Sequence, residues 1–151
     1  SMGSRFGTHI PGRPGERVRS LAEQASRLRM TWPSLRTEIR GEKLIAQGTL
    51  QPSALGVAYL VRFEYELGGV PVASVLSPKL SPRAAGEAIP HVYPGPRPCL
   101  WLPSSGEWTG KKLLSTTVVP WLLLWLMYYE LWHATGEWLG GGEHPQASKQ
   151  P

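Results

Sequence analysis

The feature that most constrains the fold is an alternation of packed and wetter side chains over residues 59–66. The two sets are Tyr59, Val61, Phe63 and Tyr65 on one side, and Leu60, Arg62, Glu64 and Glu66 on the other. Successive side chains of a β-strand point to opposite faces, so this pattern predicts a strand with one packed face. We place this strand at residues 56–67 and expect Gly68-Gly69 to turn the chain back.

Three further segments have the composition of strands. Residues 35–40, 43–50 and 70–76 are short runs divided by turn residues. Together with residues 56–67 they predict a four-stranded antiparallel meander. Residues 77–103 contain so many prolines that we expect a packed loop without regular structure, because each proline removes a donor and restricts its neighbour.

Helices are expected before and after these strands. Pro14 fits the first turn of a helix that ends at Pro33, with one apolar stripe formed by Val18, Leu21, Ala25, Leu28 and Trp32. The second helix is predicted from Thr117, as its cap, to about Thr135, with Gly136 as its stop. The fold class is therefore α+β, with the C-terminal helix packed on the sheet.

The second helix raises the question of a membrane. Its apolar part, residues 118–129, is shorter than the roughly 20 residues that cross a bilayer, so we expect no membrane insertion. An aromatic stripe, formed by Trp121, Trp125, Tyr128 and Trp132, is expected to pack on the sheet and not on nucleic-acid bases.

Length and composition predict one domain. A chain of 151 residues with 41% apolar content closes one core, which we assign to residues 15–140. Residues 1–14 are expected to be a flexible basic segment without a secretion signal, and residues 141–151 a flexible tail. A single cysteine excludes an intrachain disulfide and favours a reducing compartment, so the expected location is the cytoplasm.

The net charge of +5 comes from one end of the chain. Eight of the sixteen basic residues lie within the first forty positions, namely Arg5, Arg13, Arg17, Arg19, Arg27, Arg29, Arg36 and Arg40. Two interpretations fit: a solvated helix face, or a docking surface for an acidic partner.

The chemistry is restricted by what the sequence lacks. The chain has no aspartate and no asparagine, which excludes a Ser-His-Asp triad and an EF-hand loop. We expect neither a metal nor a cofactor. The candidate residues are Cys99 and His91, in the unusual proline-rich stretch from His91 to Trp101. A cysteine thiolate is a strong nucleophile whose thioester stays reactive toward amines.

Neighbouring side chains bear on that assignment. If residues 97–99 are extended, Arg97 and Cys99 point the same way about 7 Å apart, so the guanidinium would favour the thiolate. His91 is a candidate to orient the loop or to shuttle a proton. The plain alternatives are a buried inert thiol and a histidine that satisfies backbone carbonyls.

The order of these elements resembles that of the ubiquitin-conjugating enzymes. The motifs are similar to those of a bacterial branch found in antiphage islands, beside cyclic-oligonucleotide synthases. These islands are the operons of cyclic-oligonucleotide-based antiphage signalling (CBASS). The matching motifs are His91-x-Tyr93, Cys99-Leu100-Trp101, Glu107-Trp108, Pro120-Trp121, Trp125-Leu126, Tyr128-Tyr129-Glu130, Trp132, Thr135-Gly136 and Trp138. Eukaryotic members carry His-Pro-Asn, whose asparagine helps to stabilise the oxyanion. Here Val92 and Tyr93 follow His91, which leaves oxyanion stabilisation unassigned.

The resemblance implies a fold and a function. It implies a ubiquitin-conjugating fold in which Cys99 forms a thioester with the C-terminal glycine of a protein cargo, in that setting the cyclic-oligonucleotide synthase. A ubiquitin-activating-like enzyme is a possible loading partner, because the chain has no ATP-binding glycine loop. Two alternatives remain open: a noncatalytic adaptor of the same fold with Cys99 buried, and a nucleic-acid binder using its basic end and tryptophans.

Overall fold

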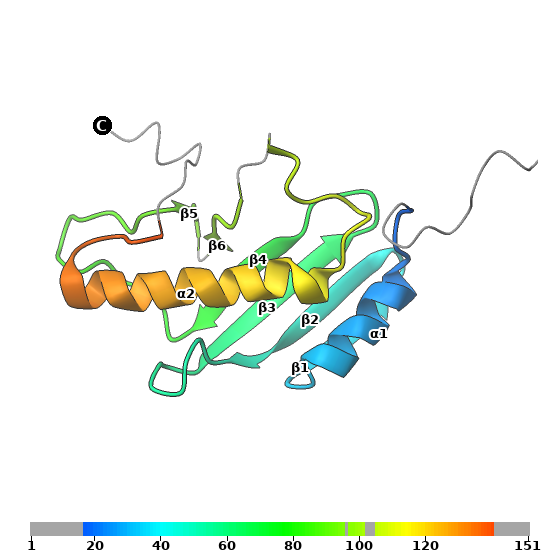
Figure 1. The fold of residues 1–151 in the computed structure, drawn as a ribbon, viewed down its shortest axis with the longest axis horizontal. Coiled ribbons are helices and arrows are strands. Elements are labelled where there is room, and N and C mark those ends of the chain that lie inside the picture. Colours follow the sequence, from blue (N-terminus) through cyan, green and yellow to red (C-terminus); the bar gives the residue numbers. More distant parts are fainter. Residues whose placement is uncertain (1–16, 96, 102–104, 141–151) are drawn as a thin grey trace, which may run out of the picture.

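The computed structural model describes residues 17–95, 97–101 and 105–140. Its elements are α1 (Leu21–Thr31), β1 (Leu35–Arg40), β2 (Lys43–Leu50), β3 (Tyr59–Glu66), β4 (Val72–Ser77), β5 (Val92–Tyr93), β6 (Arg97–Pro98), the 3-10 helix η2 (Leu114–Thr116) and α2 (Val118–Thr135). The segments 1–14 and 141–151, which were expected to be flexible, lie outside the described residues. The α+β class, with one helix before and one helix after the four strands of the antiparallel sheet in the chain, is confirmed (Figure 1).

The four long strands form the predicted meander, in the order β1-β2-β3-β4. The bounds of β1 and β2 match the sequence prediction, whereas β3 begins three residues later than expected. The chain before it is held in a loop by side chains: the Gln51 amide donates to the Gly56 carbonyl at 2.7 Å, and the Val57 N–H donates to Glu130 at 3.0 Å. β4 begins at Val72, directly after Pro71, which has no N–H to offer.

The first helix begins later than predicted. Ser20 is its N-cap, and its Oγ accepts from the Glu23 N–H at 3.1 Å. Ser20 and Glu23 have the spacing of a capping box, which starts the helix at Leu21 and not near Pro14. Val18 therefore lies outside the helix, is 57% exposed and does not belong to the buried stripe. Leu21, Ala25 and Leu28 do face the core, together with Gln24.

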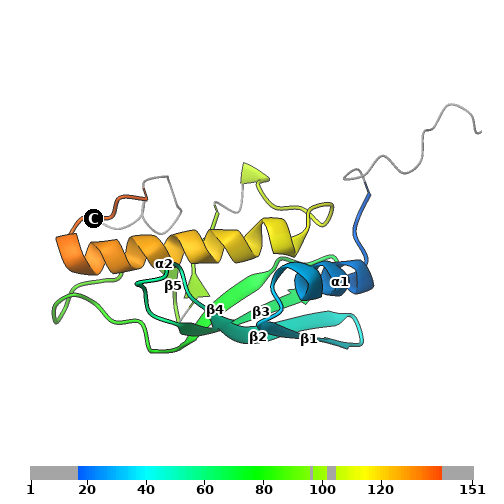
Figure 2. The same cartoon turned by 60° about the horizontal axis from the view of Figure 1, so that its bottom comes forward.

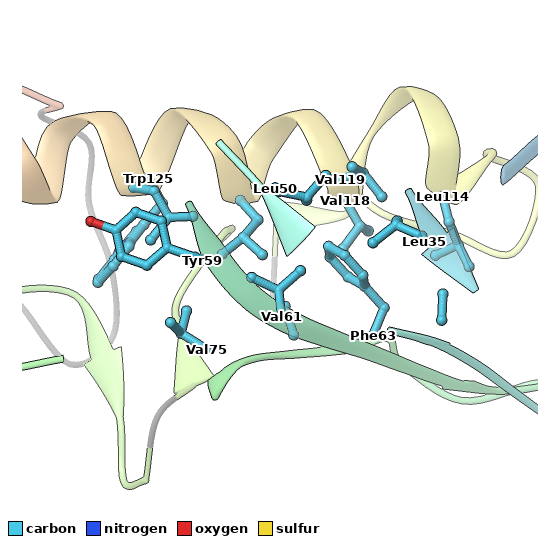
Figure 3. Close-up of a cluster of buried hydrophobic side chains, with 14 of the residues drawn as sticks. Leu35, Leu50, Tyr59, Val61, Phe63, Val75, Leu114, Val118, Val119 and Trp125 are labelled. Atoms are coloured by element: carbon cyan, nitrogen blue, oxygen red, sulfur yellow. The ribbon is translucent and has the colours of Figure 1, made fainter. Parts of the chain in front are cut away.

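Both helices cover the same face of the sheet (Figure 2). Figure 3 shows the core between α2 and the sheet, where Val118 and Val119 meet Val61 and Phe63 of β3. All four apolar side chains of the alternating set in β3 are buried, which confirms that pattern. Burial of this apolar surface is the main force that holds the helices on the sheet.

The aromatic stripe of α2 is packed, as expected. Trp125 and Trp132 are buried, while Trp121 and Tyr128 are half-buried. Trp121 meets Trp101 of the loop, with their ring centroids 5.7 Å apart. The stripe therefore packs within the protein, against the core and the loop.

The two ends of α2 differ in how well they were predicted. Gly136 is the C-cap, with φ 84°, so its lack of a Cβ permits the left-handed conformation there. Thr117 holds the N-cap position, but its hydroxyl donates to the Leu113 carbonyl at 2.7 Å and does not cap the helix. The chain enters α2 through η2 instead. In the part of the chain that the structure describes, no helix is both long enough and apolar enough to traverse a lipid bilayer.

The proline-rich loop contains regular structure after all, which corrects the prediction for residues 77–103. β5 and β6 form a two-stranded antiparallel hairpin in which Val92 pairs with Pro98 and Tyr93 with Arg97. The next pair is bonded, because Cys99 donates its N–H to the His91 carbonyl. Hydrogen-bonded and non-bonded pairs alternate in such a ladder, so Pro98 falls at a position that needs no N–H.

Candidate functional site

The hairpin that carries the candidate residues is tied to α2 through one carbonyl. The oxygen of His91 accepts from the Cys99 N–H at 2.9 Å and from the indole Nε1 of Trp125 at 3.0 Å. The backbone of His91 has a positive φ of 54°, which is uncommon for a residue other than glycine. The backbone of His91 and Cys99 is therefore held in a fixed relation to the helix that covers the sheet.

Three side chains share one face of this hairpin. Tyr93 lies opposite Arg97 in the register of the hairpin, and Cys99 comes two residues after Arg97 along the second strand. Residues two apart point to the same side, and a diagonal neighbour is within reach of an aromatic side chain. The Tyr93 hydroxyl and the Cys99 thiol indeed share a hydrogen bond.

Tyr93 was not singled out as a candidate from the sequence. A loop without strands gives no register, so nothing placed Tyr93 beside Cys99. A hairpin places Pro98 at a position without a hydrogen bond. That register puts Tyr93 and Cys99 on the same face, and it is the signal by which Tyr93 can be recognised.

Cys99 is buried, with 6% of its surface exposed. It is nevertheless absent from the contiguous core cluster formed by the sheet and the helices. Burial raises the pKa of the Cys99 thiol to about 12, and the Tyr93 hydrogen bond and the Arg97 charge oppose this shift only in part. The expectation that Arg97 would favour the thiolate is therefore right in sign but is outweighed by burial.

Arg97 lies at the exposed end of the shared face. Its Nε donates to the Pro94 carbonyl at 3.0 Å, across the turn of the hairpin. Gly95 in that turn has a positive φ of 84°. The guanidinium is thus directed back to the turn, while the thiol two residues later is covered, which explains why the charge acts weakly on it.

His91 sits among aromatic rings. Its imidazole lies 5.2 Å from the ring of Trp138, centroid to centroid, and Trp138 also packs on Trp125 at 5.4 Å. Burial lowers the pKa of His91, so the imidazole is neutral at pH 7. The chain after α2 therefore folds back over His91 and covers the base of the hairpin.

A cavity of about 210 Å³ lies between the hairpin and the edge strand β4. Val70, Pro71, Val72 and Ala73 line one side, and Tyr93, Arg97, Pro98, Leu100 and Trp101 line the other. Tyr93 thus contributes both to the cavity wall and to the hydrogen bond with Cys99. Its phenol therefore lies next to both the covered thiol and the cavity.

Over residues 17–95, 97–101 and 105–140, no three His, Cys, Asp or Glu side chains gather as potential metal ligands. The groups that this arrangement brings together are a protonated thiol, a phenol donor and a neutral imidazole.

Arg5 and Arg13 of the basic end lie outside the described residues, and the described arginines divide into two groups. Arg19 is paired with Glu23, donates to the Lys111 carbonyl at 3.1 Å and is only 12% exposed at its side chain. Arg17 and Arg40 are paired with Glu23 and Glu38. Arg27 and Arg36 are exposed. Arg19 is therefore held within the protein, which corrects both the solvated-face and the docking-surface interpretation for this residue, whereas the exposed arginines remain available to a partner.

Fold and site together define an α+β domain with a buried thiol in a hairpin at the edge of its sheet. The sequence model of the type II CBASS E2 proteins matches residues 24–145. The chain belongs to this E2-CBASS family, which confirms the resemblance seen in its motifs and supports an E2-like role in CBASS. No curated protein matched the chain.

Proposed function

We propose that this protein is an E2-like acyl carrier in which Cys99 holds the C-terminal glycine of a protein cargo as a thioester. The observation that carries the proposal is the placement of Cys99: it lies outside the core cluster, in an anchored hairpin beside a cavity. A thiol that served only packing would be expected within the core between the sheet and α2. Membership of the E2 family supports this proposed reaction class.

The cargo that we propose is the cyclic-oligonucleotide synthase of the same CBASS system. Its C-terminal carboxyl would arrive activated, as an acyl adenylate or a thioester on a ubiquitin-activating-like enzyme. The Cys99 sulfur forms a bond to the carbonyl carbon, the bond to the leaving group breaks, and the thiol proton passes to a base. An amine then attacks the new thioester and releases the Cys99 thiol.

His91 is the proposed proton carrier of this reaction. Its neutral imidazole has the capacity to accept a proton at pH 7, and its backbone is joined to that of Cys99. General acid-base help contributes roughly a hundredfold or more. Replacing His91 by asparagine, which tolerates the positive φ, should therefore slow transfer far less than loss of Cys99. If this variant transfers the cargo as fast as the wild type from about pH 6 to 9, His91 has only a structural role.

One observation favours a second function, that of a noncatalytic adaptor. Cys99 is 6% exposed and the pKa of its thiol is raised to about 12, so only about one molecule in 10⁵ carries a thiolate at pH 7. An adaptor would keep this thiol covered permanently. The carrier, by contrast, must expose it when a partner engages the hairpin.

The test is coexpression with the cyclic-oligonucleotide synthase and the other proteins of its operon, followed by intact mass spectrometry. The carrier predicts a species with the mass of both proteins that hydroxylamine separates, because hydroxylamine cleaves thioesters. Cys99→Ala should abolish this species. An adaptor gives a complex that dissociates under denaturing conditions without hydroxylamine, in the wild type and in Cys99→Ala alike.

A further inference from the structure

Acyl transfer to a thiol is accelerated by a hydrogen-bond donor for the carbonyl oxygen. When sulfur attacks the carbonyl carbon, negative charge develops on that oxygen, and a preorganised donor lowers the barrier. This chain contains no asparagine that could supply such a donor. The donor must therefore come from another group near Cys99.

Two N–H donors beside Cys99 are already committed. The N–H of Cys99 donates to the His91 carbonyl, and the indole N–H of Trp125 donates to the same oxygen. Moving either of them onto an acyl group would break the bonds that fix the hairpin. Neither is suited to the task.

The Tyr93 hydroxyl has the required position. It shares the hairpin face with Cys99, is hydrogen-bonded to the thiol and lines the adjoining cavity. The oxygen of an acyl group attached to Cys99 is separated from the sulfur by one carbon atom. A donor directed at the sulfur therefore reaches this oxygen through a small side-chain rotation.

We propose that Tyr93 is a catalytic residue that donates its hydroxyl hydrogen bond to the carbonyl oxygen of the cargo while Cys99 is acylated. This inference rests on the proposed acyl-carrier function and assigns its oxyanion donor. Burial raises the pKa of Tyr93, so the phenol stays protonated and keeps its donor at neutral pH.

Acylation of Cys99 needs no reactant other than the activated acyl donor. The thiol proton leaves to solvent or to a base, the sulfur–carbon bond forms, and the carbonyl π electrons move to oxygen, where the Tyr93 hydroxyl donates. The carbonyl then re-forms and the bond to the leaving group breaks, with a proton returned to that group. Tyr93 keeps its own proton throughout.

The experiment compares two reactions of the same thiol. A peptide ending in glycine, prepared as its mercaptoethanesulfonate thioester, acylates Cys99 through an oxyanion. Iodoacetamide alkylates Cys99 by displacement at a saturated carbon, with no oxyanion. Both reactions use the Cys99 thiolate, so the ratio of their rates removes the effect of thiol ionisation, and a change in this ratio relative to the wild type reports the oxyanion donor.

Tyr93→Phe should lower the ratio of acylation to alkylation at least about tenfold, since loss of one oxyanion donor costs up to 10²–10³. Tyr128→Phe, a half-buried tyrosine on α2, is the matched control and should leave the ratio unchanged. An unchanged ratio in folded Tyr93→Phe overturns the inference while the proposed function stands. A wild type that is alkylated but never acylated overturns both.

A second variant covers the case in which Tyr93→Phe does not fold, as judged by near-ultraviolet circular dichroism. Fluorotyrosine placed at position 93 keeps the ring and strengthens the donor. The acylation-to-alkylation ratio should then rise above that of the wild type. An equal or lower ratio contradicts the assignment.

Discussion

The indole nitrogen of Trp125 donates a hydrogen bond of 3.0 Å to the carbonyl oxygen of His91, and so joins α2 to the hairpin that carries Cys99. The same oxygen also accepts from Cys99. Helix packing and thiol position are thus coupled through one acceptor.

Trp125→Phe should therefore loosen the hairpin. Loss of the hydrogen bond alone costs about 0.5–1.5 kcal/mol, and the smaller ring adds a packing loss. We expect faster alkylation of Cys99 by iodoacetamide under native conditions. Trp132→Phe, a similarly buried tryptophan of the same helix, is the control. Equal acceleration in both variants would show general destabilisation and not loss of this contact.

The pH dependence of alkylation reports the environment of Cys99. Because burial raises the pKa of the thiol to about 12, the native rate should be low at pH 7 and climb about tenfold per pH unit past pH 9, where an ordinary thiol levels off. In denaturant the curve should level near pH 9. A native plateau near pH 8 would mean that the thiol is open to solvent.

His91 should make folding stability fall in mild acid. Burial holds its folded pKa below 6.5, so its stabilising effect is complete above that value and is lost as pH falls toward the folded pKa, while the unfolded chain takes up the proton. The free energy of unfolding of the wild type should decline below about pH 6.5. His91→Asn should show a flatter profile, and parallel curves would assign the decline to other groups.

Two arginines of the basic end should behave in opposite ways. Arg19 bridges Glu23 and the Lys111 carbonyl, so Arg19→Ala should lower the melting temperature. Exposed Arg27 should be replaceable by glutamate without loss of stability. If the exposed arginines dock an acidic partner, Arg27→Glu weakens capture of the cyclic-oligonucleotide synthase and makes the remaining binding less salt-sensitive. Undiminished capture at low and high salt would move the docking surface elsewhere.

The sheet could be predicted from the sequence more accurately than the candidate site. Alternation and turn residues gave β1 and β2 to the residue, because each strand has one face that must be buried. The start of α1 differs from the prediction because the Ser20 side chain caps the helix, whereas Pro14 is only compatible with a first turn. Helix propensity alone does not choose between two possible starts.

The hairpin shows why the site was harder to predict. Prolines argue against strands until the pairing shows which positions need no N–H, as at Pro98. Without that register neither the Tyr93 contact nor the burial of Cys99 follows from residue order. Burial is a property of the packed chain. It raises the pKa of the Cys99 thiol more than the Arg97 charge lowers it, which is the opposite of the outcome expected from the sequence.

The most direct test of the central claim uses the variant Cys99→Ser, coexpressed with the cyclic-oligonucleotide synthase and the rest of its operon. A serine at this position would retain the cargo as an oxygen ester, which is more stable than the thioester. Tandem mass spectrometry of tryptic peptides should show the C-terminal glycine of the synthase joined to residue 99. A wild type without any hydroxylamine-sensitive adduct, together with a Cys99→Ser variant unmodified at residue 99, would contradict the acyl-carrier account and leave the adaptor.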